Sequence, residues 1–357
     1  MAASVKIFFY ILTFPLMVFL LHTDISIPVR QARPFQKPEI NIWYGHQQHF
    51  GFPGRAQRWI NILGNITNPE MVTEASYQLN SGPVQPLTLG SDLHRLARPG
   101  DFNVEIGYDD LQPSNQLKLT FTTNSRQTIT EKMNIHLEEK SRWPLPYQVD
   151  FSEVKDLQDV VQVVDGHWEL TDQGVHTVAP YYDRVLSLGD TSWHDYESLI
   201  NLTIHDFITP EPGPPTYNVT HFGVAMRWQG HTKDGRQPSR QWYPLGAQGE
   251  FLLKPELDSC RWRILYDGNF KSKPATYSKS LNPIALNEKI KIRTQVKTLE
   301  NNHTRYRFKQ WKATDPEPAH WDLEGIEDGK SDLSSGALCL VPHNSEVTIH
   351  TVEVKPI

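Results

Sequence analysis

The sequence predicts an all-β protein in which two β-sandwiches follow one another after an N-terminal apolar segment. Three observations support this prediction. Many runs alternate apolar and polar residues with a period of two, and Gly, Pro, Asn and Asp residues separate them. No stretch carries the 3.6-residue apolar period over three helical turns. The chain also holds 10 Trp, 13 Tyr, 15 Phe and 26 Pro, a composition that favours strands and turns over helices.

The N-terminal 26 residues form the apolar segment. Lys6 precedes a mostly apolar run at 7–21, which as a helix spans about 22 Å, short of the roughly 30 Å hydrocarbon core of a bilayer. We expect either a cleaved signal peptide or an uncleaved signal anchor, with a buried core helix as the third interpretation. Each of the first two predicts a secreted, periplasmic or cell-surface protein that contacts a membrane only through this segment. The polar, Pro-rich residues 27–40 are expected to be a linker.

The first sandwich is expected over residues 41–145. Five alternating runs fall in it, at 59–66, 75–80, 101–108, 117–123 and 128–138. Strands of this length and spacing suit an immunoglobulin-like sandwich, although the Cys…Trp…Cys pattern of true immunoglobulin domains is absent. The Pro-containing stretch 140–148 places the boundary near residue 145.

The second sandwich is expected over residues 146–357, with longer strands. Its alternating runs lie at 198–208, 221–230, 249–254, 260–268, 289–299, 304–312, 336–341 and 345–354. A two-sheet jelly roll suits this pattern better than a propeller, because no 40-residue repeat is present.

Four stretches of this second part carry a family resemblance. They are GHWEL at 166–170, FGVAMRWQGH at 222–231, YRFKQW at 306–311 leading to EPAHW at 317–321, and GALCL at 336–340 followed by SEVTI at 345–349. In this order they resemble the concanavalin A-like, laminin-G-like jelly rolls of exported proteins. That superfamily includes lectin-like glycan binders, protein-binding modules, and polysaccharide hydrolases and lyases. The resemblance therefore implies a fold without selecting a function.

Aromatic loops of the second part are the candidate binding site. Indole rings offer flat apolar surface to the C–H faces of sugars, and planar polar groups beside them fix a ligand's orientation. The expected ligand contacts are Arg227, Trp228, His231, Trp242, Tyr243, Glu317 and Trp321. The competing interpretation packs tryptophans between the sheets, and we favour it for Trp168, Trp228 and Trp262.

The loop after the run 304–312 raises the same choice. Tyr306 and Phe308 share a face and should point inward, whereas Trp311 has the opposite parity. Pro316 and Pro318 restrict the backbone around Glu317, so the loop is stiff. A stiff loop suits ligand contact, and it suits equally well the capping of an open end of the sandwich.

Composition and motifs argue against some classes of function. The net charge is −6 with no basic block, which argues against nucleic-acid binding. The Glu-x-Asp-x-x-Glu string of laminarinase-type relatives is approached only at 256–261, where Arg261 replaces the second glutamate. We therefore expect non-catalytic binding of a glycan or other extracellular ligand. A polysaccharide hydrolase or lyase, and a purely structural or adhesive surface module, remain as alternatives.

No cofactor is required by any motif. The family resemblance implies a calcium ion at the sandwich rim as an option, with Asp190, Asp195, Asp206 and Asp267 near predicted strand ends. Zinc-binding spacing is absent. Cys260 and Cys339 are expected either to form a disulfide or to be two buried thiols, because the sequence does not fix the distance between them.

Overall fold

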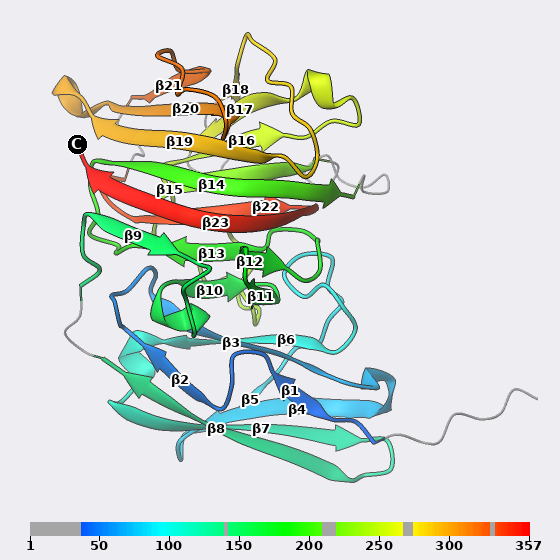
Figure 1. Cartoon of the computed structure of the whole chain (residues 1–357). Helices are drawn as coiled ribbons and strands as arrows, with labels where there is room; N and C mark the ends of the chain where they lie inside the picture. The colour runs from blue at the N-terminus through cyan, green and yellow to red at the C-terminus, as the bar shows by residue number, and fades with distance from the viewer. Residues whose placement is uncertain (1–36, 139–141, 209–218, 267–273, 329–332) are drawn as a thin grey trace, which may run out of the picture. The chain divides into compact units, whose positions relative to one another are not determined.

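Strands dominate the part of the chain that the structure, a computed structural model, describes: residues 37–138, 142–208, 219–266, 274–328 and 333–357 (Figure 1). Residues 37–357 cluster as one unit through their contacts. The expected signal or anchor segment and most of the linker fall outside the described residues. Within the described residues, no helix has the length and apolar character needed to cross a membrane.

Strands β1–β8 form two sheets, which we call the small sandwich. The three-stranded sheet has the order β1 (Ile40–Ile42), β3 (Trp59–Ile66) and β6 (Asp101–Gly107). The five-stranded sheet has the order β2 (Gln47–Phe50), β8 (Thr128–Leu137), β7 (Ser114–Thr123), β4 (Val72–Leu79) and β5 (Val84–Pro86). Both sheets contribute to one core, in which Ile60 and Val104 of the first pack with Phe121 and Ile135 of the second.

Strands β9–β23 form two larger sheets, the large sandwich. The seven-stranded sheet has the order β10 (Gln162–Asp165), β13 (Val185–Leu188), β22 (Ala337–His343), β15 (His221–Trp228), β16 (Ala247–Leu252), β17 (Arg261–Tyr266) and β18 (Thr276–Tyr277). The eight-stranded sheet has the order β11 (Trp168–Thr171), β12 (Gly174–Thr177), β23 (Ser345–Pro356), β14 (Tyr196–Phe207), β19 (Lys289–Thr298), β20 (Thr304–Lys312) and β21 (Leu323–Glu327), and β9 (Tyr147–Asp150) also pairs with β23.

Helical structure in the described residues is limited to five single 3₁₀ turns. These are η1 (Pro69–Met71), η2 (Tyr108–Asp110), η3 (Leu157–Asp159), η4 (Leu257–Ser259) and η5 (Glu300–Asn302). The expectation of an all-β chain is therefore confirmed.

The core of the large sandwich lies between its two sheets, and alternation along the strands builds it. Trp168, Trp262, Tyr306 and Phe308 are all buried in this core, as the sequence predicts. We use the term outer face for the side of each sheet turned away from this core. The immunoglobulin-like topology and the boundary near residue 145 remain predictions.

The two cysteines are free and buried, which resolves the choice left open by the sequence. Cys339 lies in β22, where its thiol donates to the Ser187 hydroxyl at 3.3 Å. Cys260 directly precedes β17, which is three strand positions away, or about 14 Å across the sheet. A disulfide needs Cα atoms within about 7 Å, so this fold does not permit the bridge.

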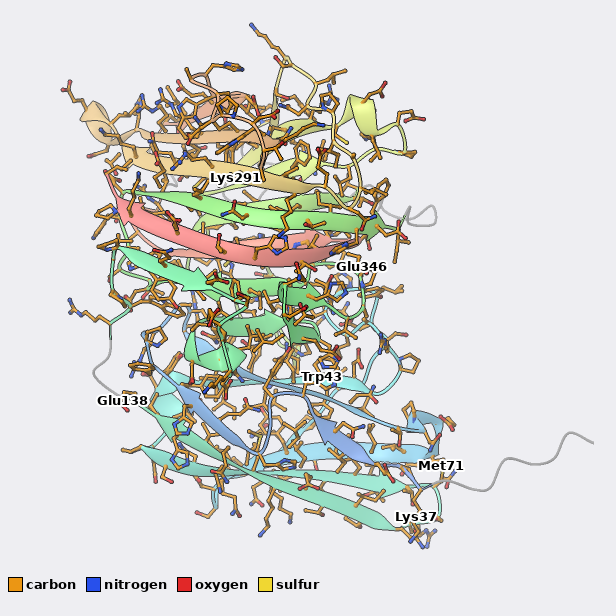
Figure 2. The ribbon with its side chains drawn as sticks, viewed as in Figure 1. Lys37, Trp43, Met71, Glu138, Lys291 and Glu346 are labelled. Carbon is orange, nitrogen blue, oxygen red and sulfur yellow. The ribbon has the colours of Figure 1, made fainter. Side chains whose placement is uncertain are left out.

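The two sandwiches meet through polar and aromatic contacts. The ring of Trp43, which is labelled in Figure 2, stacks on His167 with ring centroids 4.7 Å apart. The hydroxyl of Tyr44 donates to the Gly166 carbonyl and accepts from the Trp168 amide, each at 3.0 Å. Burial raises the pKa of Tyr44, so this hydroxyl keeps its proton at neutral pH.

Candidate functional site

A β-bulge determines the direction in which the side chain of Arg227 points. The register between β15 and β22 shifts between Ala225 and Trp228, and Arg227 has a positive φ of 55°. The bulge turns the guanidinium inward, where it donates to Asp195, Thr298 and Thr304 at 2.7–2.9 Å. Arg227 is 1% exposed and ties strand ends together. We therefore correct the expectation that it contacts a ligand.

The same bulge moves Trp228 to the outer face of the seven-stranded sheet. There it packs with His231 and Trp242, and its indole N–H donates to the Trp242 carbonyl at 2.9 Å. Trp228 and His231 are buried, so their expected ligand contacts are corrected as well. Burial also lowers the pKa of His231, which keeps its imidazole neutral. Trp242 is half-buried and Tyr243 is exposed.

Glu317 and Trp321 lie on the other side of the sandwich. Glu317 accepts two hydrogen bonds from Arg293 of β19, each of 2.7 Å, and pairs with Lys309. Lys309 also lies 4.9 Å from the centroid of the Trp321 ring. The stiff loop thus packs on the outer face of the eight-stranded sheet. The seven predicted contacts do not converge on one site.

A groove lies between the small sandwich and the loop that follows β15. Its volume is about 620 Å³. Tyr77 of β4, Gln85 of β5 and Glu105 of β6 line one side, and Lys233, Arg236 and Gln237 of the loop line the other. The Gln237 amide donates to the Tyr77 hydroxyl at 3.3 Å and to the Glu105 carbonyl at 3.1 Å. The loop flanked by His231 and Trp242 in the sequence therefore does contribute to a concave surface.

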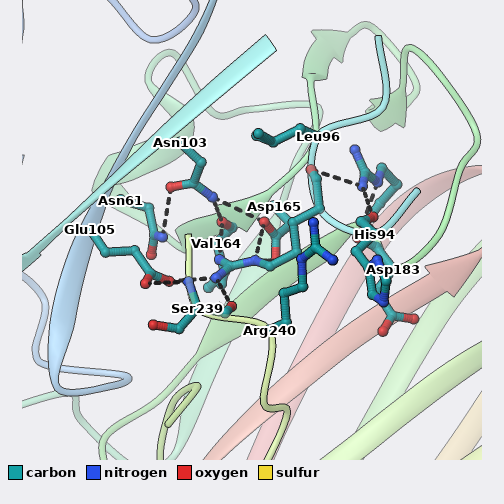
Figure 3. A network of polar contacts seen from close by, with 12 residues as sticks. Asn61, His94, Leu96, Asn103, Glu105, Val164, Asp165, Asp183, Ser239 and Arg240 are labelled. Atoms are coloured by element: carbon teal, nitrogen blue, oxygen red, sulfur yellow. Dashed lines mark hydrogen bonds and ion pairs between the residues drawn. The ribbon is translucent and has the colours of Figure 1, made fainter. Parts of the chain in front are cut away.

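A buried polar network holds this loop in place (Figure 3). Arg95 donates to both oxygens of Asp165 at 2.8 and 2.9 Å, and it also binds Glu105 and the Ser239 carbonyl. Glu105 in turn accepts the Ser239 amide at 2.9 Å, and Asn103 donates to Asp165 at 3.0 Å. Burial alone would lower the pKa of Arg95, but the two carboxylates outweigh it and the net direction is upward. This ionic hub connects β6, β10 and the groove-lining loop.

A second polar cluster crosses the outer face of the seven-stranded sheet. His343 of β22 and His221 of β15 are paired in register, and their rings stack with centroids 4.8 Å apart. His343 Nδ1 lies 2.7 Å from an Asp183 carboxylate oxygen, and His221 Nε2 lies 3.5 Å from Glu250. Each imidazole therefore has a carboxylate beside one nitrogen. Within the described chain, the other nitrogens, His221 Nδ1 and His343 Nε2, are buried without a hydrogen-bond partner.

Further contacts extend this cluster along β16 and β17. Arg263 donates to Glu250 through two nitrogens, and the Gln248 amide donates to Glu250 at 3.1 Å. Gln248 accepts the Trp242 indole N–H at 2.8 Å. Burial raises the pKa of Glu250, with Arg263 opposing it, and burial lowers the pKa of His221 well below its usual value.

The His221 ring and the Gln248 amide lie close over Gly223 at the centre of this cluster. A Cβ atom placed on it would lie 3.1 Å from His221 Nδ1 and 3.2 Å from the Gln248 amide nitrogen. Glycine within a central strand often marks a place where something approaches the backbone closely. Here the unpartnered nitrogen of His221 is among the atoms that approach it.

Sequence reasoning missed this cluster although its strands were predicted. His221, Gly223, Glu250 and Arg263 fall in expected alternating runs at outward parity, and Gln248 lies one residue before the run 249–254. The ligand contacts expected from the sequence lie in aromatic loops, and these outward positions on the strands are not among them. A search for titratable residues at outward parity in the expected strands would have found His221, Glu250 and Arg263, but not Asp183 or the order of the strands.

The other expected acidic sites are not assembled. Asp195 and Asp206 lie at opposite ends of β14, about 36 Å apart, and Asp190 is bonded to Ser192 and the Arg55 amide. Asp267 falls outside the described residues. Glu256 and Asp258 are exposed beside and within the turn η4 and do not form a buried catalytic pair.

Comparisons with known proteins add little to this description. Neither protein-family models nor curated proteins give a match. Among solved structures, the Ca²⁺-bound exoplasmic/lumenal domain of VIP36 is 8% identical, with a TM-score of 0.38 over 58% of this chain and 89% of that chain. The metal-free carbohydrate recognition domain of Emp46p is 10% identical, with a TM-score of 0.39 over 60% and 99%.

The alginate lyase Aly36B is similar at the same level, 9% identical with a TM-score of 0.37 over 60% of this chain and 98% of that one. Identities and TM-scores this low support no inference about fold or function. The proposals below rest on the residues of this chain alone.

Proposed function

We propose that this protein is exported and binds a glycan in the groove between the small sandwich and the loop after β15. The observation that carries the proposal is the groove itself, a concavity of about 620 Å³ with aromatic, carboxamide and charged side chains along it. This size lies within the range typical of small-ligand sites. The export part rests only on the apolar N-terminal segment of the sequence.

The chemistry of the lining suits sugar hydroxyl groups. Gln85, Gln112 and Gln237 present carboxamides, which donate and accept hydrogen bonds in one plane. Tyr77 adds a half-buried phenol ring that can pack on the C–H face of a sugar. Burial raises the pKa of Tyr77, so its hydroxyl stays protonated as a donor at neutral pH.

The position of the lining residues is fixed before a ligand arrives. The ionic hub of Arg95, Asp165 and Glu105 fastens Ser239, and Gln237 is bonded across the groove to β6. A preformed site loses little conformational entropy on binding. The same hub joins the two sandwiches, so we expect the groove to be kept only in the intact chain.

A glycan array followed by titration calorimetry tests the proposal. With a glycan that the full-length protein binds, Tyr77→Ala and Gln237→Ala should each weaken affinity at least about tenfold, the usual cost of losing a well-packed contact. The matched control is Tyr243→Ala, which removes an exposed tyrosine outside the groove and should change affinity less than about twofold. An array without any binding would favour a structural or adhesive module.

The same glycan distinguishes the remaining alternatives. If Tyr243→Ala or Trp321→Ala abolishes binding while Tyr77→Ala does not, the aromatic loops expected from the sequence are the site, and the groove proposal is wrong. New reducing ends or unsaturated ends released from a polysaccharide would show a hydrolase or a lyase instead of a non-catalytic binder.

A further inference from the structure

The histidine cluster on the seven-stranded sheet takes no part in the proposed groove. Asp183, His221 and His343 each bring one nitrogen or oxygen donor atom to the same place, and these three atoms all lie within 4.8 Å of one another. Asp183 precedes β13, His343 is in β22 and His221 is in β15. Two neighbouring strands, together with the segment that leads into a third, therefore supply the donors.

The side chains carry the features of metal ligands rather than of an ordinary buried polar cluster. Two imidazole nitrogens, one on each ring, are buried without a hydrogen-bond partner, which is costly for folding. The other nitrogen of His221, Nε2, has the Glu250 carboxylate beside it at 3.5 Å. A metal-bound histidine usually donates its second N–H to such a carboxylate, which orients the ring and raises its basicity.

The surroundings also suit a small cation. Arg263 and Gln248 fix Glu250 in place. Gly223 carries no side chain that would crowd His221 Nδ1, which a Cβ atom there would approach to 3.1 Å.

We propose that Asp183, His221 and His343 form a binding site for a divalent transition metal such as Zn²⁺, with Glu250 as a supporting carboxylate. Ligand atoms around a tetrahedral zinc ion lie roughly 3.4 Å apart, from metal–ligand distances of about 2.1 Å. The Asp183–His343 pair at 2.7 Å would open slightly, and His221 would move closer. Because the two rings now lie 15° from parallel, one imidazole turns on binding, and no hydrogen bond at its free nitrogen is lost.

The donor set separates this site from the calcium site expected at the rim. Calcium binds six to eight oxygen ligands, whereas two imidazoles with carboxylate suit zinc, cobalt or nickel. We expect Ca²⁺ to leave the cluster unoccupied at concentrations where Zn²⁺ fills it.

Metal uptake by the full-length protein tests the site. After removal of metal with a chelator, dialysis against Zn²⁺ should load about one ion per chain, measured by mass spectrometry, and excess Ca²⁺ should not compete. His343→Gln and Asp183→Asn should each weaken Zn²⁺ binding at least about tenfold, and Glu250→Gln should weaken it less. The matched control is His176→Gln on the outer face of the eight-stranded sheet, which should leave affinity unchanged.

Cobalt gives a second measurement that needs no variant. Co²⁺ bound to wild-type protein by nitrogen and oxygen ligands in tetrahedral geometry should give intense visible absorption bands, and Zn²⁺ should displace them. Failure of the wild-type protein to take up either ion overturns the proposal, even if a variant does not fold. Loss of binding in His176→Gln, or unchanged binding in His343→Gln, would place the metal elsewhere and also overturn it.

Discussion

The two outer faces of the large sandwich carry their charges in opposite ways. Glu317, on the eight-stranded sheet, has a side chain 37% exposed, and Arg293 and Lys309 lower its pKa to about 2. Glu250, on the seven-stranded sheet, has a side chain 3% exposed and also pairs with an arginine, yet burial raises its pKa. The pKa of one glutamate is thus lowered and that of the other is raised, because desolvation dominates only where water is excluded.

The difference indicates where function is to be sought. An exposed ion pair contributes little to stability and costs little to form. A buried charge costs several kcal/mol in desolvation, and a hydrophobic replacement of the pair is often as stable. Charges kept in a buried cluster with unpartnered imidazoles are therefore better explained by a ligand than by folding.

The largest expected effect is a loss of stability on removing the carboxylate of the buried cluster. Glu250→Ala leaves Arg263 and His221 buried without their carboxylate, and we expect a loss of about 3–5 kcal/mol in the free energy of unfolding, measured with denaturant. The double variant with Arg263→Met should recover most of this loss, because it removes the unpaired charge. A loss below 1 kcal/mol would show that the cluster is far more hydrated than its burial indicates.

A pH titration of stability sharpens the comparison. Burial lowers the pKa of His221 well below 6.5, so below pH 6.5 the unfolded chain binds a proton that the folded chain does not. Stability should therefore fall as the pH drops from 6.5 to 5.5, by about 1 kcal/mol for this one group. His221→Gln should flatten that part of the curve. An unchanged slope would mean that His221 is protonated in the folded protein.

Adding a methyl group at Gly223 should affect the buried face through Zn²⁺ affinity rather than stability. In Gly223→Ala the new methyl group would crowd His221 Nδ1 and the Gln248 amide. We expect Zn²⁺ affinity to fall about tenfold, while the melting temperature stays within about 5 °C, since alanine suits a strand better than glycine. Equal zinc affinity in the wild-type protein and this variant would contradict the role given to Gly223.

The smallest effect belongs to the exposed face. Glu317→Gln should cost less than about 1 kcal/mol at pH 7, because the pair with Arg293 is partly screened by solvent. The carboxylate has a lowered pKa in the folded state, so its contribution is present above about pH 4.5 and is lost as the pH falls toward 2. The wild-type and variant melting curves should therefore converge in acid. A difference that persists at pH 2 would contradict this account.

Long alternating strands were predictable because burial of one face imposes a period of two. The runs 59–66 and 304–312 coincide with β3 and β20, and Tyr306 and Phe308 point into the core as expected. The short strands β10 and β13 were missed. All four residues of each are buried, so neither shows alternation.

The candidate sites were much less predictable than the strands. Alternation alone would place Arg227 outward, but the bulge between β15 and β22 turns it inward and carries Trp228 to the outer face. A bulge depends on the pairing of two strands, so a single run of sequence does not reveal it. Trp321 and Trp242, similar in their sequence surroundings, end on opposite faces of the sandwich.

By itself the sequence determined that this chain is all-β and where most long strands run, because propensity and periodicity are local properties of neighbouring residues. Only the tertiary structure decided what those strands bring together. Strand order places His221 beside His343 and Asp183, and the hub of Arg95 fastens a distant loop against the small sandwich. Such contacts depend on which strands pair and in what register, and a pattern that repeats every two residues fits many pairings equally well.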